Sequence, residues 1–412
     1  MDIGIRCFLT RTQGMGGEIK RDPEDFYVEE IIDLKLGDGD YCVVKVTKKN
    51  WDTLRLVKQM AKVLRISQKR ISFAGTKDKK AVTVQYFSIK GAKGEDLQRV
   101  GIKDVEIEFL GYSRREIRLG DLLGNFFRIR VHDCKNGEKF NEIRMELEEK
   151  GVPNFFGEQR FGTRFITHEV GKLILQGNFK EAFWTYVAKP SEVEKKEITK
   201  IRRELWDCRD PAFGLREFPK HLVYERTLLQ KLREGLDEKR ALLSLPKTLK
   251  MMFVHAYQSY LFNRLLSKRI EDFRTLKAIF EDDWASYITY KTKKPSFTDF
   301  SRVGVNKKRV EFLINEGYAT LALPLVGYET QLEGWCKVAK EFLAENNLDV
   351  SSFKTEHKEF SSSGSYRSAE IPLKITDLRF ENCVFEFYLP AGCYGTVFLR
   401  EFLKKDFIEE ES

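Results

Sequence analysis

The sequence has no cysteine or histidine pattern of a metal site. Its five histidines form no spaced set, and its seven cysteines are scattered without a C-x-x-C pair: Cys7, Cys42, Cys134, Cys208, Cys336, Cys383 and Cys393. Structural zinc sites need closely spaced ligands of these types, so we expect no bound metal. An odd number of widely separated thiols is typical of a reducing compartment, where disulfides are rare.

Long apolar runs are also missing. The first 20 residues, MDIGIRCFLTRTQGMGGEIK, lack the apolar core of a signal peptide. No stretch approaches the ~20 apolar residues of a membrane-spanning helix. We therefore expect a cytoplasmic protein.

Several nucleotide-binding and hydrolase motifs are absent as well. The segment GTKDKK lacks the second glycine and the Lys-Ser/Thr of a phosphate-binding loop, and no G-x-G-x-x-G opens a helix. Neither H-E-x-x-H nor G-x-S-x-G occurs. These absences argue against a nucleoside triphosphate site, a dinucleotide cofactor, a zinc protease and a serine hydrolase.

Positive charge is what the sequence has in excess. With 72 Lys and Arg residues against 63 Asp and Glu, the formal net charge is +9 and the isoelectric point is near 9.0. This balance indicates a polyanionic partner, with nucleic acid the first candidate and an anionic membrane surface the second. At 412 residues the chain exceeds one ordinary domain, which favours two domains or one domain with a large insertion.

Up to about residue 163 the chain mixes strand and helix patterns. The predicted elements are a strand at 40–49, a helix at 51–64 with Asp52 or Thr53 as N-cap, a strand at 124–133 and a helix at 140–150 that stops at Gly151.

The middle of the chain has a different texture. Helical spacing of apolar residues recurs in five segments, 167–188, 193–206, 226–235, 247–270 and 307–323. A polar stretch at 354–368 separates them from a β-rich tail at 383–405. Because the two ends share a character that the middle lacks, we predict an α/β (α+β) catalytic body formed by both termini, with a mainly helical insertion between them.

One carboxylate among bases is the main candidate for chemistry. The segment TKDKK places Asp78 beside Lys77, Lys79 and Lys80, between two β-rich runs that predict a loop at the ends of strands. Flanking cations favour an ionised carboxylate, which suits a nucleophile or a base, and the lysines suit the phosphates of an RNA. A surface turn in which Asp78 accepts hydrogen bonds from backbone amides explains the same residues.

Three further segments have two interpretations each. KRDPEDFYVEE at 20–30 fits an amphipathic edge strand or part of a site. GVPNFFGEQRFGTRF at 151–165 combines glycines, aromatics and arginines, which fits base stacking with phosphate contact, or aromatic core packing beside a turn. HAYQSYLFNRLL at 255–266 predicts a core helix, and its histidine is a minor candidate for a base.

Taken together, these segments resemble the successive motifs of the TruD family of tRNA pseudouridine synthases. The matching stretches run in order from about residue 18 to residue 402: KRDPEDFYVEE, FAGTKDKKAVTVQ, GVPNFFGEQRFG, AYQSYLFN and FYLPAGCYGTVFLRE. Five collinear motifs are far more specific than any one of them. In the last motif, Cys393 and Gly395 replace the Ser and Ala of the family's common G-S-Y-A-T or G-S-F-A-T.

The resemblance implies a fold and a domain arrangement. The pseudouridine synthase fold has a mixed, largely antiparallel sheet with flanking helices, here interrupted by a mainly helical TRUD insertion domain. The implied catalytic domain is discontinuous and comprises residues 1–163 and 367–412, with the insertion domain at 164–366.

The resemblance also implies the reaction. In this family the N-glycosidic bond of a uridine in tRNA, commonly at position 13 beside the D arm, is broken, and the uracil turns and rejoins through C5. The catalytic aspartate falls on Asp78, and the residues implied in substrate binding are Lys20, Phe26, Asn154, Phe156 and Tyr394. Lys20 is expected to pair with the catalytic acid and Phe156 to stack near the flipped base. The isomerisation is redox-neutral, so no cofactor is implied.

Two functions of other classes compete with this one. A non-catalytic RNA-binding or chaperone protein would use the same basic surface without turnover. A metal-dependent nuclease would need clustered carboxylates. Neither an obligate protein partner nor a membrane contact is predicted.

Overall fold

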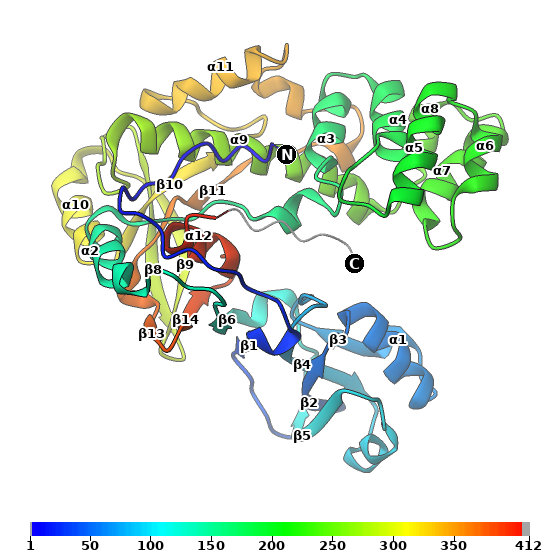
Figure 1. Cartoon of the computed structure of the whole chain (residues 1–412), viewed down its shortest axis with the longest axis horizontal. Helices are drawn as coiled ribbons and strands as arrows, with labels where there is room; N and C mark the ends of the chain where they lie inside the picture. The colour runs from blue at the N-terminus through cyan, green and yellow to red at the C-terminus, as the bar shows by residue number, and fades with distance from the viewer. Residues whose placement is uncertain (1, 406–412) are drawn as a thin grey trace.

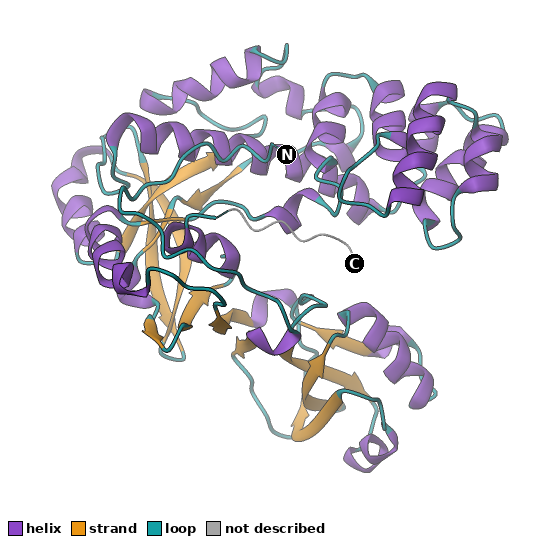
Figure 2. Ribbon diagram, viewed as in Figure 1, coloured by secondary structure: helices purple, strands orange, loops and turns teal. Residues whose placement is uncertain are grey.

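The computed structural model describes residues 2–405, which form two main sheets, a short two-stranded sheet and a long run of helices (Figure 1; Figure 2). The larger sheet has the strand order β13-β14-β6-β1-β4-β2-β5, with β3 paired to β4. Its strands are β1 (Phe26–Ile32), β2 (Tyr41–Lys49), β3 (Ile71–Phe73), β4 (Val82–Lys90), β5 (Val105–Ser113), β6 (Leu122–Arg130), β13 (Arg379–Glu381) and β14 (Val384–Pro390). Within this sheet β1 and β4 run parallel, and the other described pairs are antiparallel.

The first predicted strand and helix are confirmed as β2 and α1 (Thr53–Val63). In β2, side chains at alternate positions, including Val44 and Val46, are fully buried. Asp52 is the N-cap of α1, because its carboxylate accepts a hydrogen bond of 2.9 Å from the Arg55 amide. The apolar face of α1 packs with this end of the sheet in one core.

The predicted helix at 140–150 is α2 (Phe140–Lys150), and it buries the expected face of Phe140, Ile143 and Leu147. It ends where Gly151 takes a φ of 89°, a conformation that glycine adopts without steric cost. The chain then enters the short strand β7 (Val152–Pro153), which pairs with β12 (Glu370–Ile371) from the C-terminal part of the chain.

Helices dominate the middle of the chain. They are α3 (Thr167–Leu175), α4 (Phe179–Ala188), α5 (Lys196–Cys208), α6 (Pro211–Glu217), α7 (Val223–Arg233), α8 (Glu238–Leu243), α9 (Lys247–Phe273), α10 (Lys307–Asn315) and α11 (Val338–Ala344). The helices α4 to α8 form a bundle at the right of Figure 1, and α9 runs across the upper part of the view, below α11. No helix within residues 2–405 is both long enough and apolar enough to span a membrane.

A second sheet interrupts the helices, which the apolar spacing did not predict. It has the order β11-β10-β8-β9, with β8 (Trp284–Lys291), β9 (Lys294–Arg302), β10 (Ala319–Leu325) and β11 (Ser365–Ser368). The prediction of helical structure through residue 323 was wrong, because the helix ends at Asn315 and the rest is β10. Six of the seven residues of β10 are buried, and a continuous apolar run carries no period that separates strand from helix.

The C-terminal tail completes the larger sheet and adds a helix. β14 lies between β6 and β13, and α12 (Gly395–Leu403) follows it. The prediction of a β-rich tail therefore holds only as far as Pro390. Eight of the nine α12 residues are buried. The predicted fold class, α/β (α+β) with a mixed, largely antiparallel sheet and flanking helices, is confirmed.

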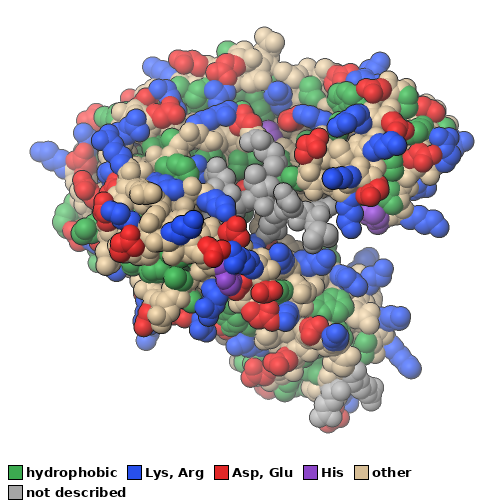
Figure 3. Space-filling model, viewed as in Figure 1, with side chains coloured by type: hydrophobic (Ala, Val, Ile, Leu, Met, Phe, Trp, Pro, Cys, Tyr) green, Lys and Arg blue, Asp and Glu red, His purple; other side chains and the backbone are tan. Residues whose placement is uncertain are grey.

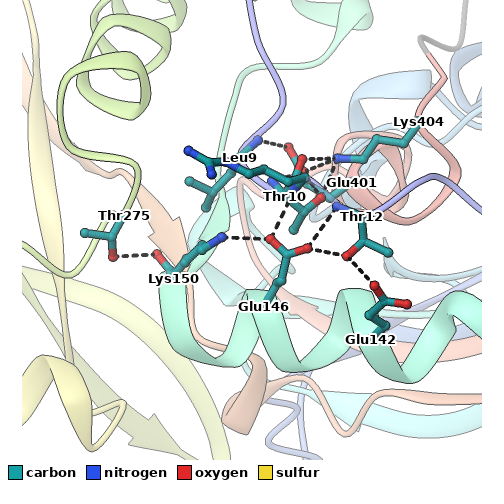
Figure 4. Close-up of polar contacts among 10 residues, drawn as sticks. Leu9, Thr10, Thr12, Glu142, Glu146, Lys150, Thr275, Glu401 and Lys404 are labelled. Carbon is teal, nitrogen blue, oxygen red and sulfur yellow. Dashed lines mark hydrogen bonds and ion pairs between the residues drawn. The ribbon is translucent and has the colours of Figure 1, made fainter.

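A buried carboxylate holds the N-terminal segment against α12 (Figure 4). Glu401, which is 1% exposed, accepts hydrogen bonds from the backbone amides of Leu9 and Thr10 at 3.0 and 3.1 Å. Lys404 donates to the Thr10 carbonyl at 2.8 Å and lies 3.2 Å from Glu401. These contacts fix the path of the segment that leads to Lys20.

Glu146 on α2 holds the next part of the same segment (Figure 4). It accepts hydrogen bonds from the backbone amides of Arg11 and Thr12, from the Thr12 hydroxyl, and from Lys150 at 2.7 Å. Partial burial opposes ionisation, but the hydrogen bonds outweigh it and lower the pKa of Glu146 to about 2. Because the folded pKa lies below the ordinary value of 4.5, the stabilisation is complete above about pH 4.5 and is lost as pH falls through about 2.

Replacing this carboxylate should loosen the N-terminal segment. We expect Glu146→Gln to lower the free energy of unfolding at neutral pH by about 1–3 kcal/mol, because two backbone amides and an ammonium lose a charged acceptor. Urea denaturation measures the change. The matched control is Glu149→Gln, on the exposed face of the same helix, which should change stability by less than about 0.5 kcal/mol. Equal effects of the two substitutions would contradict the assignment.

The molecule is notched on one side. Figure 3 shows the notch at the right, between the α4–α8 bundle and the part of the larger sheet next to α1. Lys and Arg side chains lie on both sides of it.

Candidate active site

Asp78 lies on the loop between β3 and β4, where an ion pair and an amide hold its carboxylate. Lys20 Nζ is 2.9 Å from Asp78 Oδ2, and the side-chain amide of Gln159 donates to Oδ1. The Asp78 side chain is 21% exposed, so it remains open to a ligand. The pair that the family resemblance implied between Lys20 and Asp78 is therefore present, and Gln159 is a contact that the sequence patterns did not indicate.

The lysines adjacent to Asp78 do not surround it as the sequence suggested. Lys79 and Lys80 are exposed, and Lys77 turns inward to pair with Glu30 on β1, which is fully buried. Of the three lysines that the sequence places beside Asp78, Lys77 therefore gives its charge to Glu30 instead. A buried carboxylate attracts the nearest ammonium more strongly than a half-solvated one does, because its charge has no water to stabilise it.

A hydrogen-bond network holds the Asp78 loop at its base. Gln85 on β4 donates to the carbonyl of Gly75 at 2.8 Å and accepts from the Thr53 hydroxyl at 2.8 Å. The same hydroxyl accepts from the backbone amide of Lys77 at 3.1 Å. β4 and the start of α1 thus hold the loop at Gly75 and at Lys77, directly before Asp78, which limits how far Asp78 moves.

Lys20 is held in an uncommon conformation. It has a φ of 60°, which non-glycine residues rarely adopt, and its side chain is 7% exposed. Its ammonium lies 4.3 Å from the centre of the Phe26 ring, a cation–π contact. Phe26 is 2% exposed and packs edge-on against Phe127. The implied contact between Phe26 and a nucleoside remains a prediction, since the ring faces Lys20 and the core in this structure.

Lys48 is a second buried ammonium in this region. Burial lowers the pKa of Lys48 to about 8. The charge of Asp52 has a smaller effect that raises this pKa, and the charge of Lys77 a smaller one that lowers it. The ammonium donates a hydrogen bond of 2.6 Å to the Trp51 carbonyl. The sequence carried a signal for it, because Lys48 follows Val44 and Val46 in the alternating buried positions of β2. A charged residue that continues the series of alternate buried positions in a strand indicates a side chain that points into the core.

The loop after β7 carries the second half of the site. Gly157 on this loop lies against Tyr394, so closely that a Cβ there would be 3.0 Å from the Tyr394 ring. The rings of Phe156 and Tyr394 meet edge to face, with centroids 6.3 Å apart. Because Gln159 on the same loop contacts Asp78, the loop joins the aromatic pair to the carboxylate.

Asn154 is locked by protein contacts. It is 1% exposed, its amide nitrogen donates to the Ser368 carbonyl at 2.9 Å, and its oxygen accepts from Arg367 Nη2 at 2.8 Å. The guanidinium of Arg367 lies 4.1 Å from the centre of the Phe156 ring. Arg367 was missed at the sequence level because it lies in the polar stretch interpreted as a separator. The contact implied between Asn154 and a nucleoside remains a prediction.

No cluster of three or more His, Cys, Asp or Glu that could hold a metal occurs within residues 2–405. All seven cysteines are free thiols. The groups that the described site brings together are one carboxylate, nearby ammonium and guanidinium groups, amides and aromatic rings.

Comparison with known proteins identifies the family of this chain. A family model described as tRNA pseudouridine synthase D (TruD) matches residues 2–402. The chain belongs to the TruD family of tRNA pseudouridine synthases. This confirms the resemblance seen in the motifs, and the members of this family are isomerases.

Individual relatives match over nearly their whole length. A protein of Archaeoglobus fulgidus named "Probable tRNA pseudouridine synthase D" is 64% identical over 98% of both chains. A protein of the same name from Pyrococcus abyssi is 39% identical over 96% of this chain and 98% of its own. The crystal structure of a Methanosarcina mazei protein that carries the TruD name superposes with a TM-score of 0.80, at 35% identity, covering 98% of this chain and 97% of that one.

The structure explains one departure from the common TruD tail motif. At Gly395, where the family commonly has alanine, a Cβ would lie 2.8 Å from Phe127 Cε1. The Phe127 ring is 6% exposed and stacks on Phe387 with centroids 5.2 Å apart, so it has little room to move. At the other replaced position, Cys393 is buried and hydrogen bonds with Asn154, and burial raises the pKa of its thiol to about 11.

A double-mutant cycle tests this interpretation of Gly395. We expect Gly395→Ala to destabilise the protein by about 1–2 kcal/mol, because overpacking against Phe127 exceeds the gain in helix propensity. In a Phe127→Leu background the same change should cost less, as measured by urea denaturation. Gly120→Ala, which meets open space, is the matched control and should be neutral. Additive effects of the two core substitutions would contradict the explanation.

A buried carboxyl lies directly behind the site. Glu370 on β12 is 1% exposed, and neither of its carboxyl oxygens has a hydrogen-bond partner within residues 2–405. Burial raises the pKa of Glu370 to about 8, against a weaker opposite effect of Lys277. The native state therefore retains a proton that the unfolded chain loses near pH 4.5, and stability falls as pH rises from about 4.5 to about 8.

Replacing Glu370 by a residue that does not titrate should make the free energy of unfolding depend less on pH. Between about pH 5 and about pH 8 we expect the free energy of unfolding of the wild type to fall by roughly 2–4 kcal/mol more than that of Glu370→Gln. The comparison requires urea denaturation of both proteins across that range. Parallel profiles would show that Glu370 is ionised throughout in the folded protein.

Proposed function

We propose that this protein converts uridine to pseudouridine in tRNA with Asp78 as the catalytic carboxylate. The observation that carries the proposal is the contact of Asp78 with both Lys20 and Gln159, in a TruD-family chain. The ammonium of Lys20 pairs with the carboxylate, and the partial exposure of Asp78 leaves it accessible. A surface turn would not need two partners brought from distant parts of the chain.

The reaction exchanges one carbon–nitrogen bond for one carbon–carbon bond, and one C–H bond for one N–H bond. The bond between uracil N1 and ribose C1′ breaks, a bond from C5 to C1′ forms, the C5 proton leaves and N1 gains a proton. No electrons leave the substrate, so we propose that no cofactor or metal takes part. Asp78 acts by attack on C1′, by addition to C6, or by abstraction of the C2′ proton. Each route requires an ionised carboxylate within bonding reach of a nucleoside turned out of its stack.

We propose the substrate contacts in two groups. Tyr394, which is partly exposed, stacks on the flipped uridine, since such rings bind bases by stacking. Phe156, which is 6% exposed and meets Tyr394 edge to face, lies next to that stack. Lys20, Phe26 and Asn154 complete the substrate-binding set. Lys20 orients the catalytic carboxylate, and the Phe26 ring packs against the Lys20 ammonium. Arg367 fixes Asn154 in position.

The proposed domain arrangement assigns recognition to different parts of the chain. Residues 1–163 and 367–412 form the catalytic domain and residues 164–366 the TRUD insertion domain. The tRNA binds along the basic notch of Figure 3, in the cytoplasm, and presents the uridine at position 13 beside the D arm. Shape recognition by the insertion domain selects that position, because A-form RNA offers little sequence information to side chains.

Neutralising the catalytic carboxylate separates catalysis from binding. We expect Asp78→Asn to reduce pseudouridine formation in an unmodified tRNA transcript by at least about 10³-fold, because the amide is neither a nucleophile nor a base. Affinity for the same transcript, measured by filter binding, should change by less than about threefold. Pseudouridine is mapped at single-nucleotide resolution after reaction without added cofactor.

The matched control and a chelator exclude the competing functions. Asp38→Asn alters an exposed carboxylate outside the site and should react like the wild type. Turnover by Asp78→Asn at the wild-type rate would disprove the assignment. Absence of turnover in the wild type would favour a non-catalytic RNA-binding protein, and RNA cleavage that stops in a chelator would favour a nuclease.

A further inference from the structure

Two guanidinium groups pack against the same aromatic ring of the site. The Cζ atom of Arg367 lies 4.1 Å from the centre of the Phe156 ring, and that of Arg160 lies 5.5 Å from it. Both side chains are partly exposed. They come from segments far apart in the sequence, so the fold creates this pair of cations.

Neither guanidinium has a carboxylate partner. Within residues 2–405, no acidic group lies within 4.0 Å of Arg160 or Arg367. Arg164, which is close to Arg160 in the sequence, shows the usual pairing of a buried arginine. Glu194 and Glu225 lie 4.0 and 3.8 Å from its guanidinium. Partly buried cations are normally paired with an acidic group, so two guanidinium groups that face the same ring without one favour an anion between them.

Both groups keep donors for such an anion. Arg367 uses Nε and Nη2 on Asn154, and its Nη1 has no hydrogen bond to any residue of the described chain. Gly392 lies beside that nitrogen, where a Cβ would be 3.6 Å away, so little fills the space in front of it. Arg160 uses Nε on Ser259 at 3.0 Å, which leaves its two terminal nitrogens available.

The surroundings make an anion more favourable than water. Burial lowers the pKa of Arg367, and the charge of Arg160 acts in the same direction. The Arg367 cation is thus disfavoured by its burial and by the nearby charge of Arg160. An anion that contacts both guanidinium groups would offset the two effects at once, and a guanidinium matches the oxygens of a phosphate with two parallel hydrogen bonds.

We propose that Arg160 and Arg367 form a subsite for one phosphodiester group of the RNA, adjacent to the target uridine. The proposal rests on the proposed function, since Phe156 and Gln159 place this subsite next to Asp78. Arg160 follows Gln159 directly in the chain, and Arg367 holds Asn154. The subsite anchors the backbone beside the extruded nucleoside, so it adds affinity and register without taking part in the bond changes.

The salt dependence of tRNA affinity tests the proposal. Each phosphate contact contributes about 0.7–0.9 to the slope of log affinity against log salt concentration. We expect Arg160→Gln and Arg367→Gln each to lower that slope by about this amount and to raise KM several-fold. Arg367→Lys keeps the charge and should retain most of the slope. The probe is an unmodified tRNA transcript, titrated with the full-length protein.

A matched control separates this subsite from general loss of charge. Arg144→Gln removes an exposed arginine on α2 that pairs with Glu148 at 2.8 Å, and its slope should equal that of the wild type. Wild-type slopes for both Arg160→Gln and Arg367→Gln would overturn the subsite. If Arg367→Gln does not fold, Arg160→Gln decides, because it loses only one side-chain hydrogen bond. Pseudouridine formation by the wild type in the same transcripts tests the proposed function separately.

Discussion

The ion pair between Lys20 and Asp78 joins two parts of the chain that are 58 residues apart, and much of the surrounding structure serves to hold it. Two half-buried charges gain from each other only when their geometry is fixed, because each has given up part of its hydration. The protein fixes both. Glu401 and Glu146 hold the segment that leads to Lys20, and the network at Gln85 holds the loop that carries Asp78.

A second constraint comes from the loop after β7, which makes one site out of three segments. Gln159 contacts the Asp78 carboxylate, and Phe156 contacts both Tyr394 and Arg367. The hydrogen bonds of Asn154 fix the start of this loop. The loop approaches Tyr394 closely because residue 157 is a glycine, which has no Cβ. Aromatic surface, unpaired positive charge and a partly exposed carboxylate thus meet at the connections of the sheets, which is the combination that an extruded nucleotide requires.

The sequence predicted elements whose cause is local. α2 follows from its apolar spacing and from Gly151, and β2 from strict alternation. β10 escaped prediction because a fully buried strand has no alternation to detect. In the site, TKDKK pointed to Asp78, but not to the inward turn of Lys77, which depends on a buried glutamate from another strand. Arg367 could not be recognised from its polar neighbours, because its role arises from contacts with residues more than 200 positions away.

A crystal structure of the Asp78→Asn variant with an unmodified tRNA tests the role of Asp78 most directly. We expect one uridine turned out of its stack, with its ribose or base within about 3–4 Å of residue 78 and its ring against Phe156 or Tyr394. A neighbouring phosphate should lie on Arg160 and Arg367. A complex in which tRNA is bound and every uridine lies more than about 10 Å from residue 78 would contradict the central claim.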